Sequence, residues 1–320
     1  MAIVANTFTG YSAVGIREEL SNIIQNISPE TTPFISNVGS ENVTNTYFEW
    51  QEDSLSAVST TAQIDGDDVA SFAATAATTR KGNYTQILRR TTIIADNLAD
   101  QDTAGRTNEL SYQLAKRGKE IRRDLEATML LNNASVAGNA STARETGGLG
   151  AWIATNENVG TGGGLTTGDG TTARTDAASN NMRAFTETIL KDAMQQAFVS
   201  GGEPTMLMVG PVNKQKVSAF AGVAAQRYQA PSDGPTTIIG AADVYLSDFG
   251  TLSVIPNRFQ RERDGWLLDP EYASVSYLRP IQQVELAKTG DAEKSMILVE
   301  AGLKVSNEAA HAICADLTIT

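Results

Sequence analysis

Apolar residues near the N-terminus follow a helical spacing that then stops. Over residues 16–27 they recur every three or four positions, which predicts an amphipathic helix with the apolar stripe Ile16, Leu20, Ile23, Ile24 and Ile27. Pro29 and Pro33 end this pattern, because proline lacks an amide hydrogen and disfavours helix on its N-terminal side. Residues 34–38 are still largely apolar, so we predict a rigid, non-helical arm that packs against protein.

A two-residue alternation begins at Thr44 and predicts β-structure. Aromatic side chains mark the first strand (Tyr47, Phe48 and Trp50), and residues 80–98 form a second strand-like run. Small and acidic residues connect the two, so we expect an elongated hairpin. A two-stranded ribbon without a core is marginal in water, and this hairpin is therefore expected to lie against another surface.

The strongest helical pattern covers residues 103–132, with one stripe formed by Leu110, Leu114, Gly118, Ile121, Leu125 and Met129. At about 1.5 Å per residue, this helix is roughly 40 Å long and is expected to cross one face of the molecule. Residues 134–181 are rich in Gly, Thr and Asn. They predict a long loop or a partial hairpin around Trp152 and Ile153, with a flexible stretch at 160–170.

The last part of the chain has the pattern of an α/β domain. A helix is predicted over residues 185–202, a buried strand over 205–210 and a second helix from Pro211. Further strands joined by turns are expected up to the C-terminus, with residues 282–290 as a strand of their own.

Composition narrows the function classes. A formal net charge of -12 and a pI near 4.6 argue against a surface that binds nucleic acid or an acidic membrane everywhere. The single cysteine, Cys314, excludes an internal disulfide framework, and no segment reaches the roughly 20 apolar residues of a membrane helix. Only 19% of the residues are charged, which favours a surface that contacts other protein.

One dense basic cluster interrupts this acidic chain, within the predicted long helix. Its members are Lys116, Arg117, Lys119, Arg122 and Arg123. Two interpretations remain open: a solvated helix face with ion pairs three or four residues apart, or a stripe that faces phosphates without reading bases. No aromatic residues interleave, which argues against recognition of single strands.

Candidate chemistry is sparse. The single histidine, His311, has no local partners for a catalytic triad or a metal pair, and no G-x-S-x-G sequence surrounds a serine. The glycines at 160–170 lack the Gly-Lys-Ser/Thr ending of a phosphate loop. Asp65, Asp67 and Asp68 fit a solvated acidic tip, with a weak surface cation site as the alternative. We predict no catalytic, cofactor-binding or metal-binding residues, and we do not expect an enzyme.

Three sequence blocks, in this order of elements, resemble a known family. The blocks are REELSNIIQNISPETTPFISNVG (17–39), YFEWQEDSL (47–55) and LRRTTIIADNLADQDTAGRTNELSYQLAKRGKEIRRDLEATML (88–130). They resemble the major capsid proteins of tailed bacteriophages with the Hong Kong 97-type (HK97-like) fold. Residues 180–320 resemble that family in architecture more than in sequence.

The resemblance implies an α+β fold with four parts. These are an N-terminal arm (1–43), an extended β-hairpin loop (44–95), a peripheral domain with a spine helix (96–180 and 281–320, helix 103–132) and an axial α/β domain (181–280). Such a chain would self-assemble into hexamers and pentamers of an icosahedral or prolate shell that encloses double-stranded DNA. The alternatives are an encapsulin-like cargo compartment on the same fold and, in another class, an α/β enzyme or binding protein.

The resemblance also implies partners and contacts. The partners would be many copies of this chain, a scaffold, portal and decoration proteins, and DNA through weak non-specific contacts, with no membrane. The protein would belong to the virion and assemble in the host cytoplasm. Candidate intersubunit contacts are Phe34, Phe48, Trp50, Arg80, Lys81, Arg89 and Arg90, and the basic cluster would face the interior. Some relatives crosslink a loop lysine to a neighbour's asparagine; Lys81 lies in that region, but no partner asparagine can be assigned.

Overall fold

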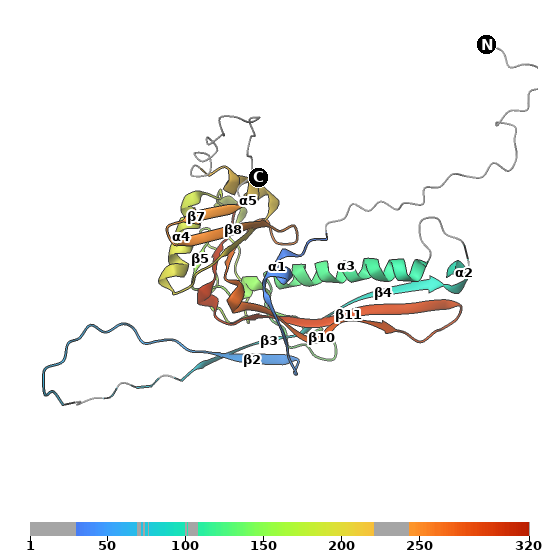
Figure 1. Ribbon diagram of the computed structural model, residues 1–320, viewed down its shortest axis with the longest axis horizontal. Helices are drawn as coiled ribbons and strands as arrows, with labels where there is room; N and C mark the ends of the chain where they lie inside the picture. The colour runs from blue at the N-terminus through green and yellow to red at the C-terminus, as the bar shows by residue number, and fades with distance from the viewer. Residues whose placement is uncertain are drawn as a thin grey trace, which may run out of the picture.

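A computed structural model of the protein describes residues 30–68, 72, 74–75, 77–99, 101, 108–220 and 243–319. The helix predicted at 16–27 lies outside these residues. The described chain has an elongated part, in which a long helix lies along a sheet, and a rounded α/β part at one end of it (Figure 1). A two-stranded hairpin projects from the molecule on the side of the sheet opposite the long helix (Figure 1).

The elongated part is a four-stranded sheet covered on one face by α3 (Glu109–Met129). Its strand order is β1 (Gly39–Asn42), β10 (Ala273–Glu285), β11 (Ala292–Val305) and β4 (Gln86–Ala95), followed along the chain by the short helix α2 (Asp96–Ala99). β1 is parallel to β10, and the other pairs are antiparallel. The predicted stripe of α3 is confirmed where it meets the core, because Ile121, Leu125 and Met129 are buried.

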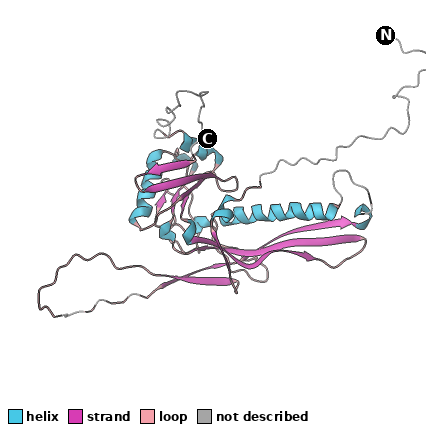
Figure 2. Cartoon of the chain, viewed as in Figure 1, coloured by secondary structure: helices cyan, strands magenta, loops and turns pink. Residues whose placement is uncertain are grey.

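The rounded part is a six-stranded sheet with helices α4 (Glu187–Val199) and α5 (Pro211–Ser218) packed on it (Figure 2). Its strand order is β5 (Glu157–Asn158), β12 (Ala312–Cys314), β9 (Gly265–Leu268), β6 (Met206–Val209), β8 (Gly250–Pro256) and β7 (Val244–Ser247). β6 is buried along its whole length, as the sequence predicted. Within the described residues there are also four short turns of 3₁₀-helix: η1 (Leu149–Ala151), η2 (Ser179–Asn181), η3 (Pro270–Tyr272) and η4 (Glu308–Ala310).

The arm differs from its prediction. Residues Pro33–Asn37 form a short helix, α1, although a non-helical arm was expected. Pro33 stands in the first turn, where a missing amide hydrogen costs nothing because that group has no partner inside a helix. β1 follows and pairs with β10 of the same chain, so the arm packs on its own subunit.

Two elements differ in length from their predictions. The long helix was predicted over 103–132, but it ends at Met129, and at its start Asn108 is the N-cap, with a side chain that accepts a hydrogen bond from Ser111 N–H at 3.0 Å. β10 continues to Glu285, where two strands were expected. Register shifts on either side of Arg279 accommodate Pro280, because proline is tolerated where a ladder is irregular.

The sheets also cross the predicted division of the chain. Residues 86–95, placed in the extended loop, form β4 and pair with β11. β5 and β12, placed in the peripheral domain, join the six-stranded sheet, where β12 pairs with both β5 and β9. β10 begins within the predicted axial domain but belongs to the four-stranded sheet.

Candidate assembly surfaces

The base of the hairpin is anchored in its own chain. Its strands β2 (Tyr47–Glu52) and β3 (Thr79–Tyr84) are antiparallel, and Phe48 and Trp50 are buried in the main core. The Trp50 ring lies 5.2 Å from the Trp152 ring, centroid to centroid. Gly302 of β11 leaves room for the Phe48 side chain, because a Cβ atom at position 302 would lie 2.7 Å from the Phe48 ring. Around Trp152, where a long loop or a partial hairpin was predicted, the 3₁₀ turn η1 ends at Ala151 and is followed by Trp152, whose indole is fully buried.

The buried amide of Asn83 completes this anchor. Its Nδ2 donates to the Leu303 carbonyl at 2.7 Å, and its Oδ1 accepts from Gly147 N–H at 2.8 Å. A buried amide with satisfied donors and acceptor holds one geometry, because any other leaves polar groups unpaired. The hairpin therefore leaves the body in a defined direction.

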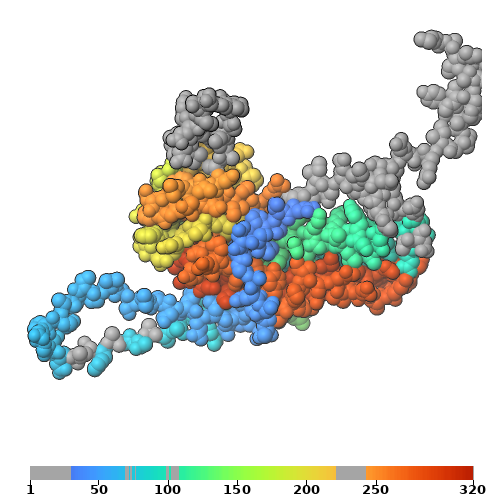
Figure 3. Space-filling model, viewed as in Figure 1, coloured from blue at the N-terminus to red at the C-terminus, as the bar shows by residue number. Residues whose placement is uncertain are grey.

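The tip of the hairpin has the opposite character. Four large apolar side chains there are almost fully exposed: Leu55 (99%), Val58 (93%), Ile64 (81%) and Phe72 (88%). The space-filling view shows residues 53–68 as a thin strand of atoms that extends beyond the body (Figure 3). From Glu52 to Thr79 the sequence contains five acidic residues and no lysine or arginine. The tip thus carries exposed apolar side chains and acidic residues, and it has no core of its own.

The apolar residues proposed as intersubunit anchors lie inside their own subunit. Phe34 is fully buried, and Phe48 and Trp50 are less than a tenth exposed. This corrects the expectation that they face a neighbour. Aromatic side chains were the strongest apolar signal in the sequence, but the exposed residues are those of the connecting tract.

The four basic residues proposed as intersubunit contacts have different surroundings. Arg80 Nε lies 3.0 Å from Glu49 Oε1 and Lys81 Nζ lies 2.9 Å from Glu52 Oε2, both across the hairpin. Arg90 donates from Nε and Nη2 to Asp124 of α3 at 2.6 and 2.8 Å. The side chain of Arg89 is exposed and, among the described residues, makes no hydrogen bond or ion pair.

A buried glutamate holds the arm. The carboxylate of Glu126 in α3 accepts from Phe34 N–H at 2.7 Å and from Ile35 N–H at 2.9 Å, two first-turn amides of α1. Asn257, directly after β8, donates to the same carboxylate at 2.7 Å. Burial raises the pKa of Glu126, although these three hydrogen bonds oppose the shift. The arm, the long helix and the α/β part thus meet at one side chain.

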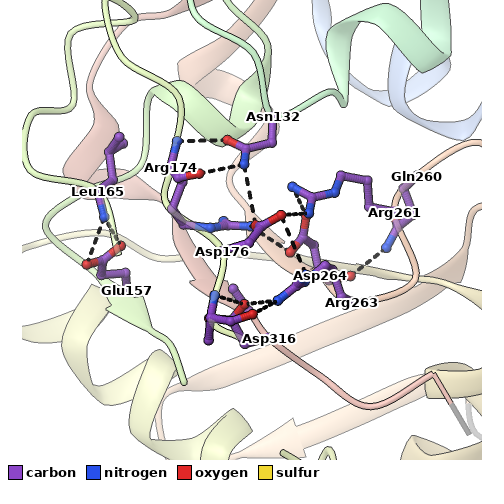
Figure 4. Close-up of polar contacts among 12 residues, drawn as sticks. Asn132, Glu157, Leu165, Arg174, Asp176, Gln260, Arg261, Arg263, Asp264 and Asp316 are labelled. Carbon is purple, nitrogen blue, oxygen red and sulfur yellow. Dashed lines mark hydrogen bonds and ion pairs between the residues drawn. The ribbon is translucent and has the colours of Figure 1, made fainter. Parts of the chain in front are cut away.

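A buried cluster of arginines and aspartates joins three distant segments (Figure 4). Arg174 and Asp264 are both inaccessible, and Arg174 Nη2 donates to Asp264 Oδ1 at 2.6 Å. Burial raises the pKa of Asp264, while the Arg174 guanidinium favours its ionised form. Asp176 lies at the edge of the cluster and pairs with Arg261.

The second half of the cluster secures the C-terminal segment. Asp316 is fully buried and accepts from Gly160 N–H at 3.1 Å, from Ala177 N–H at 2.9 Å and from Arg263. The backbone of Asp316 is left-handed, with φ of 59°, which aspartate tolerates better than most residues. The stretch 160–170, predicted to be flexible, is held here and by Glu157, which accepts from Leu165 N–H. Sequence reasoning missed this cluster, and only the basic run 258–263 hinted at it.

His311 is a buried structural residue. Its Nδ1 accepts a hydrogen bond from Asp269 N–H at 3.1 Å. Burial lowers the pKa of His311 to about 4, against the influence of the Tyr272 carbonyl, Asp269 and Glu308.

Within the described ranges, no group of His, Cys, Asp and Glu side chains could hold a metal ion. In that same part of the chain, no helix has both the length and the apolar character needed to cross a bilayer.

Comparisons with known proteins agree with this architecture. Residues 3–318 match the family described as SU10 major capsid protein. The major capsid protein of Escherichia phage Phieco32 is 29% identical over 343 residues, which cover 96% of each chain. The fold is similar to the cyanophage A-1(L) capsid asymmetric unit, with a TM-score of 0.71, 9% identity and coverage of 97% of this chain and 100% of that chain. The capsid of the native GTA particle computed with C5 symmetry gives a TM-score of 0.58, with 14% identity and coverage of 97% and 98%.

The fold is therefore that of phage capsid proteins, of the HK97 type. The chain belongs to the SU10 major capsid protein family. It is a structural protein of the virion shell and not an enzyme, and this assignment sets aside both the α/β enzyme and the cargo-compartment alternatives.

Proposed function

We propose that this major capsid protein forms hexamers and pentamers of an icosahedral or prolate shell in which the hairpin tip of each subunit lies on a neighbouring subunit. The exposed apolar tip is the observation that carries the proposal. Burial contributes roughly 25 cal/mol per Å² of apolar surface, so the tip gains stability only when another surface covers it. The anchored base gives each tip a set direction, which a repeated contact between identical subunits requires.

The charge of the tip indicates which surface it meets. Arg90 faces α3, and side chains alternate along a strand, so Arg89 points to the opposite face of the sheet. Arg89 is exposed there without an intrachain partner among the described residues. An acidic tip from a neighbour would supply the missing carboxylate. This supports Arg89 as the intersubunit candidate among the four basic residues, and leaves Arg80, Lys81 and Arg90 with partners in their own chain.

The parts of the subunit would then have separate roles. The four-stranded sheet with α3 corresponds to the peripheral domain, and the six-stranded sheet with α4 and α5 corresponds to the axial domain around hexamer and pentamer centres. The arm and the hairpin would bend between these environments while the two sheets stay fixed. Assembly in the host cytoplasm with a scaffold, a portal and decoration proteins, around weakly held DNA, completes the proposal.

Electron microscopy of a tip variant tests it. Leu55→Ser removes an apolar side chain that is 99% exposed, so the free subunit should keep its unfolding free energy within about 0.5 kcal/mol while the yield of closed shells falls several-fold. Leu131→Ser, at a residue 45% exposed outside the hairpin, is the matched control and should form shells normally. Full shell yield from the tip variant would show that the tip is not an assembly contact.

A further inference from the structure

Glu126 is an acidic residue in an apolar environment. It lies on the core-facing side of α3 with Leu125 and Met129, and its side chain is inaccessible. The two preceding carboxylates of the helix have cations as partners, because Glu120 accepts from Arg117 and Asp124 from Arg90. Among the described residues Glu126 makes no ion pair. The hydrogen bonds that its carboxylate accepts must therefore offset the cost of its burial.

The donors to this carboxylate come from two separate parts of the chain. Phe34 and Ile35 donate from α1, which lies at the end of α3 next to the α/β part (Figure 1). Asn257 donates from the α/β part, directly after β8. Oε1 of Glu126 accepts from both Phe34 N–H and Asn257 Nδ2, each at 2.7 Å. The arm and the α/β part thus share one acceptor atom.

Asn257 is itself fixed within the α/β part. It is inaccessible, its N–H donates to the Val209 carbonyl of β6 at 2.9 Å, and its Oδ1 accepts from Phe259 N–H at 2.8 Å. The Phe259 ring also contacts α3, because its centroid lies 5.7 Å from the Arg123 guanidinium. Segment 257–259 therefore connects Glu126 directly to an interior strand of the six-stranded sheet.

The two sets of donors depend on each other. Each donor favours the ionised form of the carboxylate, and an ionised acceptor makes stronger hydrogen bonds than a neutral one. Burial raises the pKa of Glu126, so its ionised form depends on all three donors. Loss of the Asn257 bond therefore weakens the bonds to Phe34 and Ile35. By thermodynamic reciprocity, loss of the arm bonds weakens the bond to Asn257 by the same factor.

Apolar packing alone would not produce this dependence. Phe34, Leu125 and Met208 belong to one core cluster, so apolar contacts also join the arm, α3 and β6. Such contacts are non-directional and tolerate small shifts, whereas hydrogen bonds weaken steeply as their angle departs from linear. The carboxylate therefore restricts the arm and segment 257–259 to one joint arrangement.

We propose that Glu126 is a positioning residue for shell assembly, which couples the arm to the α/β part by binding both through one carboxylate. The inference rests on the proposed function, in which the arm bends between hexamer and pentamer environments. It adds that the arm does not bend independently: when α1 leaves Glu126, segment 257–259 loses its fixed position, and the reverse also holds. The coupling is a property of the single subunit and can be measured before a shell forms.

The test compares two full-length variants that each lose a buried amide from the same segment. Asn257→Ala removes the donor to Glu126. Gln260→Ala is the matched control, because Gln260 is also buried and its Nε2 donates to the Asp264 carbonyl at 2.8 Å. Hydrogen exchange of individual amides is measured on the unassembled chain. In Asn257→Ala the Phe34 and Ile35 amides should exchange about five-fold faster or more, although their own residues are unchanged, and in the control they should not.

Unchanged exchange in the arm of Asn257→Ala, or equal acceleration in both variants, would overturn the coupling. Glu126→Gln tests it in the other direction and keeps the experiment decisive if Asn257→Ala does not fold. Exchange at the Phe259 amide, which bonds to Asn257 and not to Glu126, should then accelerate about five-fold or more. An unchanged rate at Phe259 would count against the inference.

Electron microscopy of the same samples tests the role in assembly. The yield of closed shells should fall several-fold in Asn257→Ala relative to Gln260→Ala. Equal yields would show that the coupling does not position the subunit for assembly. Wild-type subunits that never form shells would count against the proposed function alone, because the exchange experiment is made on single subunits.

Discussion

Neighbouring residues of one type have different roles in this protein. Arg89 and Arg90 are adjacent, yet Arg90 bonds twice to Asp124 and Arg89 is exposed. Arg174 differs again, because it is inaccessible and paired with an inaccessible aspartate. The contribution of each arginine to stability therefore depends on its burial and its partner more than on its residue type. Removal of one member of a buried ion pair is costly because it leaves an uncompensated charge.

Replacement of Asp264 by asparagine should strongly destabilise the subunit. Asp264→Asn removes the carboxylate 2.6 Å from the buried Arg174 guanidinium and leaves only Asp176, 3.9 Å away, so the free energy of unfolding should fall by about 3 to 5 kcal/mol. Glu49→Gln, which breaks the pair with the largely exposed Arg80, should cost less than about 1 kcal/mol. Urea unfolding of the unassembled chain measures both. Similar losses for the two variants would contradict the structural role of the cluster.

His311 should make the subunit sensitive to acid. Its pKa is about 4 when folded and about 6.5 when unfolded, so the unfolded chain binds the proton first as the pH falls. The stability linked to neutral His311 is complete above pH 6.5 and is lost toward pH 4, on the order of 3 kcal/mol in all. Because the chain has one histidine, NMR titration of its ring gives this pKa directly. A value near 6.5 would contradict the buried neutral state.

At the scale of elements, the arm shows how a short segment is held in place. α1 has five residues and is too short to be stable alone, and its first-turn amides have no partner inside the helix. Glu126 supplies that partner from α3, and β1 adds a ladder with β10. The arm is therefore attached to its own subunit at two points, the Glu126 carboxylate and strand β10.

Glu126→Gln should loosen the arm while the long helix stays intact. The amide keeps one acceptor oxygen, so one of the Phe34 and Ile35 N–H groups loses its bond, at a cost of about 1 to 3 kcal/mol. Hydrogen exchange at the amide that loses its bond should accelerate about five-fold or more. Glu120→Gln, on the partly exposed side of α3, is the control and should leave exchange in the arm unchanged. Unchanged protection in Glu126→Gln would show that β1 alone holds the arm.

At the scale of the whole molecule, the two sides of the four-stranded sheet carry different elements. α3 and its cations cover one face, and the hairpin leaves on the other side (Figure 1). The polar cluster of Arg174, Asp264 and Asp316 ties the long loop to the α/β part.

Sequence alone determined the local elements and the family. The hairpin, the core-facing stripe of α3, the buried strand β6 and the helices α4 and α5 follow from periodicity and turn residues, which depend only on near neighbours in the chain. Tertiary structure decided the rest. Whether Phe34 and Trp50 are buried, which sheet receives β12, and that Arg174 meets Asp264 across 90 residues all depend on the path of the chain. Contacts between distant residues leave no periodic trace in one sequence, and for that reason the buried cluster became visible only in the folded chain.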